Sequence, residues 1–106
     1  PWALLTCSPV WRLDIDGAAH RAPTDMGLYA ELAHHVPDLP DVVRQYLEAA
    51  VEPAPGATVR PWREVLADHI EAIAAFLDIT LDIDPARGGA AADALARRPG
   101  LTLRRR

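Results

Sequence analysis

Residues 61–78, PWREVLADHIEAIAAFLD, carry the clearest helical pattern in this chain. Apolar side chains recur every three or four positions, and Pro61 suits the first turn of a helix. We therefore expect an amphipathic helix over 61–77, with one face buried and an acidic face opposite. The expected buried seam contains Trp62, Leu66, Ile70, Ile73 and Leu77, helped by Val65, His69 and Phe76, and the acidic face contains Glu64, Asp68 and Glu71.

Two shorter apolar repeats come before this stretch. The first predicts a helix over about 25–36 that ends before Pro37, and the second a helix over about 40–51 that begins at Pro40. A Pro- and Gly-containing linker, Glu52–Val59, separates the second helix from the third. The core that we expect between the three helices consists of Leu32, Val36, Val43, Leu47, Leu66, Ile70 and Ile73.

Short alternating segments predict a small amount of sheet. Trp2–Cys7 and Val10–Asp16 are interpreted as two strands interrupted at Pro9, which favours an N-terminal β-hairpin or small sheet. Ile79–Ile83 is a candidate third strand. A fourth helix is expected from Asp84 to about Arg98, and Leu101–Leu103 is interpreted either as a short strand or as a frayed end.

These elements predict a helix-rich α+β fold with three main amphipathic helices. The chain has 106 residues, half of them apolar and a quarter charged, which suits one small domain over 1–106 with a basic tail over 97–106. No apolar run reaches the ~20 residues that a membrane-spanning helix requires, so we expect no membrane partner. The single cysteine, Cys7, fits a reducing compartment, and the Ala-, Arg- and Pro-rich composition suggests a bacterial, cytoplasmic protein.

Charge is distributed unevenly along the chain. Residues 1–86 contain fourteen Asp or Glu and five Arg, a net charge of −9, whereas residues 87–106 contain six Arg and one Asp, a net charge of +5. The basic tail can dock on the acidic helix face, stay solvated, or bind a partner. Nucleic acid is the least favoured partner, because the acidic body repels phosphates and no aromatic residue lies among the arginines. The candidate partner-binding residues are Trp2, Trp11, Arg97, Arg98, Arg104, Arg105 and Arg106.

Two catalytic or metal-binding alternatives rest on few residues. Asp14-Ile15-Asp16-Gly17 resembles the first motif of haloacid-dehalogenase-type phosphatases, in which one aspartate is the nucleophile beside Mg²⁺. The chain contains no lysine to hold a phosphate. Glu31 and His34 have the spacing of di-iron carboxylate bundles, but no second copy of the pattern is present. The remaining enzyme or metal-binding hypothesis combines His69 or His35 with Asp14 and Asp16.

The sequence therefore favours a non-enzymatic accessory or regulatory protein that acts through protein–protein contacts. We expect no catalytic residue, no metal and no cofactor, and a protein partner that includes the option of a second copy of the chain. A small metal-binding protein or enzyme is the first alternative, and a regulator that binds nucleic acid through the Arg-rich C-terminus is the second.

Overall fold

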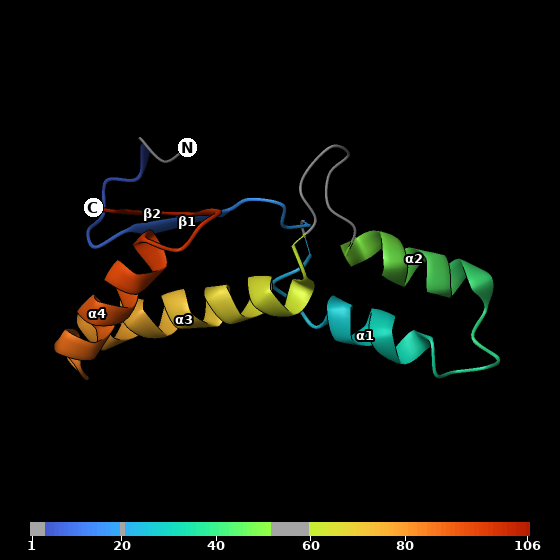
Figure 1. Ribbon diagram of the computed structural model, residues 1–106. Helices are drawn as coiled ribbons and strands as arrows, with labels where there is room; N and C mark the ends of the chain where they lie inside the picture. Colours follow the sequence, from blue (N-terminus) through green and yellow to red (C-terminus); the bar gives the residue numbers. More distant parts are fainter. Residues whose placement is uncertain (1–3, 20, 52–59) are drawn as a thin grey trace. The chain divides into compact units, whose positions relative to one another are not determined.

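The computed structural model describes residues 4–19, 21–51 and 60–106, and its secondary structure is mostly helical (Figure 1). The elements are β1 (Trp11–Ile15), α1 (Met26–Ala33), α2 (Asp41–Val51), α3 (Trp62–Thr80), α4 (Pro85–Ala96) and β2 (Leu101–Arg105). Among the described residues, four helices and a two-stranded antiparallel sheet confirm the helix-rich α+β class. In the part of the chain that is described, no helix has both the length and the apolarity needed to cross a membrane.

The chain divides into two compact units. One consists of Pro1–Ile15 and Asp68–Arg106 and is called the sheet unit below; the other consists of Asp16–Ala67 and is called the helical unit. Helix α3 contributes residues to both. That residues 1–106 form one domain stays a prediction.

The sheet joins the two ends of the chain. β1 pairs antiparallel with β2, with Trp11 opposite Arg105 and Leu13 opposite Leu103. Beyond these strands, Val10 and Arg106 exchange both backbone hydrogen bonds, at 2.7 and 2.9 Å. Backbone hydrogen bonds to β1 and Val10 therefore hold the tail as far as Arg106, and it is not frayed.

The predicted N-terminal hairpin is wrong in its pairing. Leu4–Cys7 forms no strand, and Trp2 and Ala3 lie outside the described residues. β2 is the better partner for β1 because Leu101 and Leu103 present apolar side chains on the same face of the sheet as Leu13, where they pack into one core.

The predicted strand Ile79–Ile83 is also wrong, because α3 continues to Thr80 and a tight turn follows. The backbone N–H groups of Ile83 and Asp84 both donate to the carbonyl oxygen of Asp78, at 3.1 and 3.3 Å, and so satisfy the end of the helix. The Asp84 carboxylate then accepts the backbone N–H of Arg87 at 3.0 Å and caps α4. Two helices joined by a short capped turn leave no residues for a strand.

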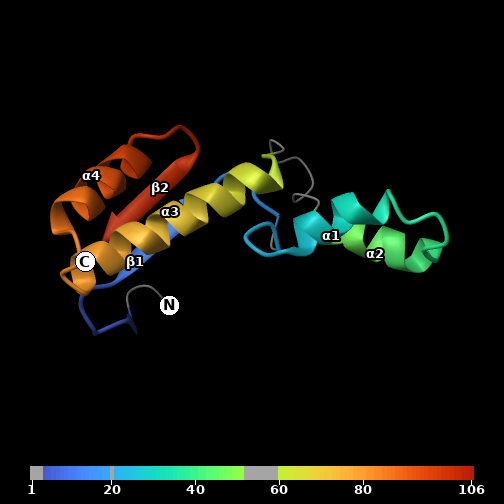
Figure 2. The same cartoon turned by 90° about the horizontal axis from the view of Figure 1, so that it is seen from below.

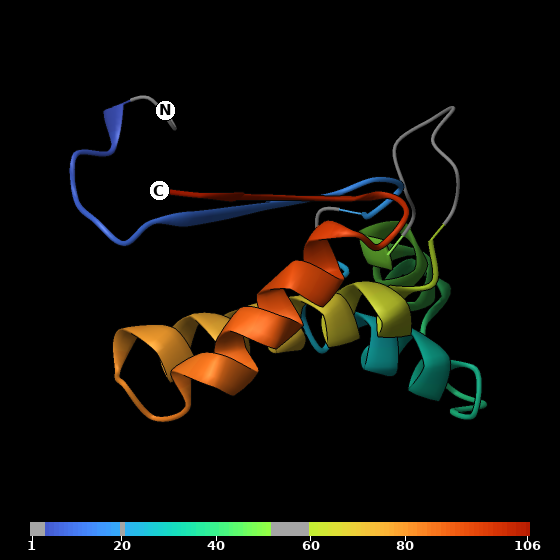
Figure 3. The same cartoon turned by 60° about the vertical axis from the view of Figure 1, so that its left-hand side comes forward.

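Helices α3 and α4 lie side by side and the sheet forms a second layer over them (Figures 2 and 3). The helices approach closely at Gly88, where a Cβ atom would lie 2.7 Å from the carbonyl oxygen of Ala75 and 2.9 Å from Cβ of Asp78. Leu95 of α4 is fully buried and forms the core with Ala72 and Leu101, against which Leu13, Ile15 and Leu103 pack.

The buried face of α3 matches the predicted seam only in part, since Val65 is 1% exposed. Ala72 and Ala75 are buried, whereas the side chains of Ile70, Ile73 and Leu77 are 58%, 52% and 41% exposed. The small residues face inward because the close approach of α4 leaves no room for larger ones. The apolar pattern correctly predicted a helix but not the side that is buried.

The helical unit shows the same inversion. α1 packs against α2, and its buried residues are the small Gly27, Ala30 and Ala33. Leu32 and Val43, which we expected in the core, are 50% and 39% exposed. A Cβ on Gly27 would lie within 2.6 Å of three Trp62 ring atoms, so this glycine makes room for the indole. The guanidinium of Arg44 donates to the Ala33 and Val36 carbonyl oxygens at 2.6 and 3.3 Å, and so ends α1 before residue 36.

Candidate functional site

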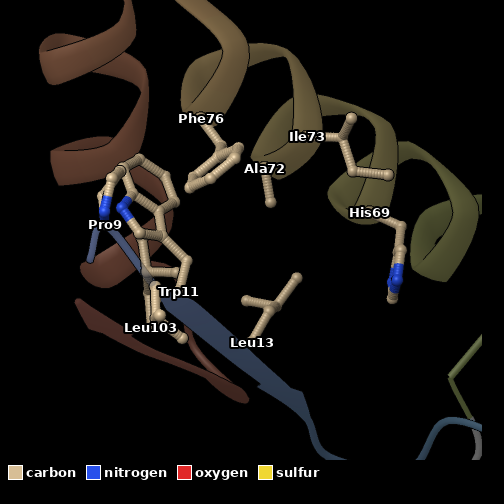
Figure 4. A pocket seen from close by; sticks show the side chains of 9 residues that line it. Pro9, Trp11, Leu13, His69, Ala72, Ile73, Phe76 and Leu103 are labelled. Atoms are coloured by element: carbon tan, nitrogen blue, oxygen red, sulfur yellow. The ribbon is translucent and has the colours of Figure 1, made fainter. Parts of the chain in front are cut away.

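An apolar pocket of about 410 Å³ lies in the sheet unit, between β1 and α3. Figure 4 shows Trp11 and Leu13 on the strand pointing toward Ala72 and Phe76 on the helix. The described residues that line it are Pro9, Val10, Trp11, Leu13, His69, Ala72, Ile73, Phe76 and Leu103.

Local structure explains why this region is hollow. Alternation along β1 turns Trp11 and Leu13 to the same side, toward α3. At one end the Trp11 and Phe76 rings meet edge to face, with centroids 5.5 Å apart and an interplanar angle of 77°. Ala72, which faces Leu13 across the pocket, has only a methyl group to fill the space between the strand and the helix.

His69 contributes the titratable side chain of this lining. Its Nδ1 atom is buried and has no hydrogen-bond partner within residues 4–19, 21–51 and 60–106. The described residues that line the pocket do not include the carboxylates named in the enzyme hypothesis. Asp14 lies on the opposite side of β1 from Leu13 and accepts a hydrogen bond from Arg12 Nε at 2.8 Å, and Asp16 and His35 belong to the helical unit.

The hypothesis that combines His69 or His35 with Asp14 and Asp16 stays a prediction. His69 stands in the pocket without a carboxylate among the described lining residues. Within the described part of the chain, no group of three or more His, Cys, Asp or Glu side chains is placed to hold a metal ion.

Beside the pocket, α3 presents a row of large aliphatic side chains, which we call the α3 apolar face: Ile70, Ile73 and Leu77. The spacing of three and four positions places them on one stripe. Ile73 belongs both to this face and to the pocket lining, so the two form one continuous apolar surface.

The outer edge of β1 lies beside the pocket, whose lining includes Trp11 and Leu13. Val10 and Arg106 form a doubly bonded pair, so in an antiparallel ladder the next bonded pairs are Arg12 with Arg104 and Asp14 with Thr102. The N–H and C=O groups of Trp11 and Leu13 then point away from β2. Within the described residues the sheet has only these two strands, and none of these residues bonds to that edge.

The basic tail is partly used inside the molecule. Arg98 donates to Asp68 and, at 2.9 Å, to Glu71, and these hydrogen bonds hold the pKa of Arg98 above its ordinary value. The predicted option of docking on the acidic face of α3 is therefore confirmed for Arg98. Glu64, the third residue of that face, lies 3.7 Å from Arg60.

The other candidate partner-binding residues lie at different places. Arg105 donates to Asp93 at 2.9 Å and lies 5.8 Å from the centroid of the Trp11 ring. Arg97 and Arg104 are exposed, the former at the end of α4. Of the predicted residues, Trp11 alone is placed in the pocket; Trp2 lies outside the described residues, and partner binding by any of them stays a prediction.

The Glu31–His34 pattern does not form an inward-facing pair. Glu31 accepts hydrogen bonds from Trp62 Nε1, at 2.8 Å, and from both Arg63 Nε, at 3.2 Å, and Nη2. The bond from Arg63, with that from Trp62, lowers the pKa of the Glu31 carboxyl. Arg63 also lies 4.6 Å from the centroid of the Trp62 ring. Glu31 thus anchors the start of α3 to α1, a role that the sequence did not predict.

The sequence analysis missed the pocket and the α3 apolar face. A signal was present in the small residues: Gly88 and Ala92 on α4, and Ala72 and Ala75 on α3, recur at helical spacing and mark where two helices meet.

Comparison with known proteins adds no relative: no family model, no curated protein and no solved structure matches this chain.

Proposed function

We propose that this protein is a non-enzymatic accessory or regulatory protein that binds another protein through the pocket and the α3 apolar face. The observation that supports this is the exposure of Ile70 and Ile73, each by more than half, beside an apolar pocket. Contiguous apolar patches on soluble proteins are commonly interaction sites. In this proposal the protein is bacterial and cytoplasmic, as its composition suggests.

Burying the exposed aliphatic side chains against a partner is more favourable than leaving them in water. Burying a large aliphatic side chain contributes about 1.5–3 kcal/mol. The α3 apolar face offers three such side chains in a row, and Trp11, a residue type enriched at binding hot spots, lies at the pocket beside them. The chain has not placed these groups in its own core, so a partner is the natural means to bury them.

The pocket chemistry also fits recognition better than catalysis. Its described lining is aliphatic and aromatic apart from His69, whose Nδ1 atom lacks a partner. Such a group orients a bound segment by accepting or donating one hydrogen bond in an otherwise apolar site.

Capture from a lysate with two matched variants tests the proposal. Ile73→Glu places a charge in the middle of the apolar surface, whereas Ile83→Glu makes the same change at the turn before α4, where the side chain is 64% exposed. We expect the parent and Ile83→Glu proteins to recover the same partner, identified by mass spectrometry, and Ile73→Glu to lose it. Equal recovery by both variants, or no partner for the parent, overturns the proposal.

A further inference from the structure

The edge of β1 and the surface beside it fit one kind of partner. Resting on the function proposed above, we propose that the partner docks by strand addition: an extended segment of another protein pairs antiparallel with the free edge of β1. Alternate side chains of that segment point toward the pocket and toward Ile73, which lines it.

The backbone of β1 supplies the bonds. The N–H and C=O groups of Trp11 and Leu13 point to the open edge, and no described residue satisfies them. An antiparallel third strand exchanges two hydrogen bonds with each such residue. The side chains of the same residues face α3, so the partner residues opposite them also face α3.

The pocket lies on the β1 side of the sheet unit. On the other side α4 is joined to β2 by the Arg105–Asp93 ion pair. The pocket is lined mainly by β1, the residues before it and α3, and it includes Ile73. A segment paired with the β1 edge therefore lies next to the pocket.

Charges on the outer face of β1 specify the partner further. Arg12 and Asp14 alternate with the inward residues, and their side chains are 46% and 37% exposed. Across the sheet Arg12 faces a like charge, Arg104, and Asp14 faces Thr102. Arg12 and Asp14 form an ion pair with each other at 2.8 Å, and a third strand can extend this pair with an acid opposite Arg12 and a base opposite Asp14. From its N-terminus to its C-terminus, the antiparallel partner segment therefore has the residue pattern apolar, basic, apolar, acidic, apolar.

A second copy of the chain fits this edge poorly. Two copies joined through β1 would place their β1 strands about 4.8 Å apart. The α3 helix beneath each strand would then approach its counterpart more closely than the 8–10 Å that packed helices need. A single extended segment has no such helix beneath it and is the occupant that the geometry favours.

Two peptides of equal composition test the register. Both peptides are capped and fluorescently labelled. In antiparallel register the valines of TVRVEVT lie opposite Ile15, Leu13 and Trp11. Its arginine then lies opposite Asp14 and its glutamate opposite Arg12, whereas TVEVRVT exchanges the two charges. By fluorescence polarisation we expect TVRVEVT to bind about tenfold more tightly than TVEVRVT. In the R12E/D14R variant, whose changes lie on the outer face, the preference should reverse. No preference in either protein overturns the inference.

Backbone chemistry gives a second arm. TVRVEVT with N-methylated valines keeps the side chains but cannot donate to the β1 edge, so we expect it not to bind. Equal binding of the methylated peptide overturns strand addition. If Ile73→Glu still abolishes capture of a lysate partner, the proposed function stands while this inference fails. Sedimentation could also show that the parent protein is a dimer and the Ile73→Glu protein a monomer. The surface would then bind a second copy of the chain, and the inference of strand addition would be overturned.

Discussion

The two sides of the sheet unit use the same kinds of residue to opposite effect. On the side of α4 and β2, Leu95 is fully buried and Arg105 bonds Asp93 at 2.9 Å, so the layers are closed. On the side of β1 and α3, Trp11 and Phe76 touch at one end only, and Ile70 and Ile73 remain more than half exposed. The contrast is between a closed side, where Leu95 is buried, and an open side, where large aliphatic side chains keep about half of their surface exposed.

The largest effect is expected from the closed side. Leu95→Ala empties a position with 0% exposure, and truncation of a buried leucine lowers the free energy of unfolding by about 2–5 kcal/mol. Urea unfolding followed by circular dichroism measures the loss. A change below about 1 kcal/mol would mean that the two layers are not closed at Leu95.

Two glycines on α4 give a matched pair. Gly88→Ala brings a methyl group to 2.7 Å from the Ala75 carbonyl oxygen, and backbone atoms cannot yield, so we expect a loss of about 1–3 kcal/mol. Gly89→Ala meets nothing within 4 Å and should gain about 0.5–1 kcal/mol from helix propensity. Urea midpoints that move in the same direction for both variants would contradict the close approach of α3 and α4.

The ion pair between Asp78 and Arg87 predicts a pH dependence. Hydrogen bonds at 2.7 and 2.8 Å from Arg87 lower the pKa of the Asp78 carboxyl below its ordinary value. The stabilisation is therefore complete above about pH 4, the unfolded value, and is lost as the pH falls through the lower folded value. Unfolding free energies at pH 7, 4 and 2.5 should show a shallower acid decline in Asp78→Asn and Arg87→Gln than in the parent. Parallel declines would show that the pair does not form.

Sequence patterns predicted the helices better than their orientation. Pro61 and the repeat of apolar residues placed α3 to within three residues at either end, because helical period is a local property. Which face is buried depends on the neighbour: Gly88 lets α4 approach α3 closely at Ala75, Asp78 and Ile79. A local pattern read in isolation therefore placed Ile70 in the core.

The strands and the site show the same limit. Leu81-Asp82-Ile83-Asp84 alternates as a strand does, but the Asp78 carbonyl bonds to Ile83 and Asp84 and forms a turn. The pairing of β1 with β2 joins residues about ninety positions apart, and no local signal specifies such a partner. For the site, Trp11 was a candidate from the start, while the pocket depends on the absence of a large side chain at Ala72.

The variant with the smallest expected change in unfolding free energy tests most directly whether the large aliphatic residues of α3 lie outside the core. The double variant Ile70→Ala/Ile73→Ala removes two large side chains from the α3 apolar face. Because both are more than half exposed and alanine favours helix, urea unfolding should give a free energy within about 1 kcal/mol of the parent. A loss of about 4 kcal/mol or more, the sum expected for two buried isoleucines, would show that they belong to the core and contradict the account.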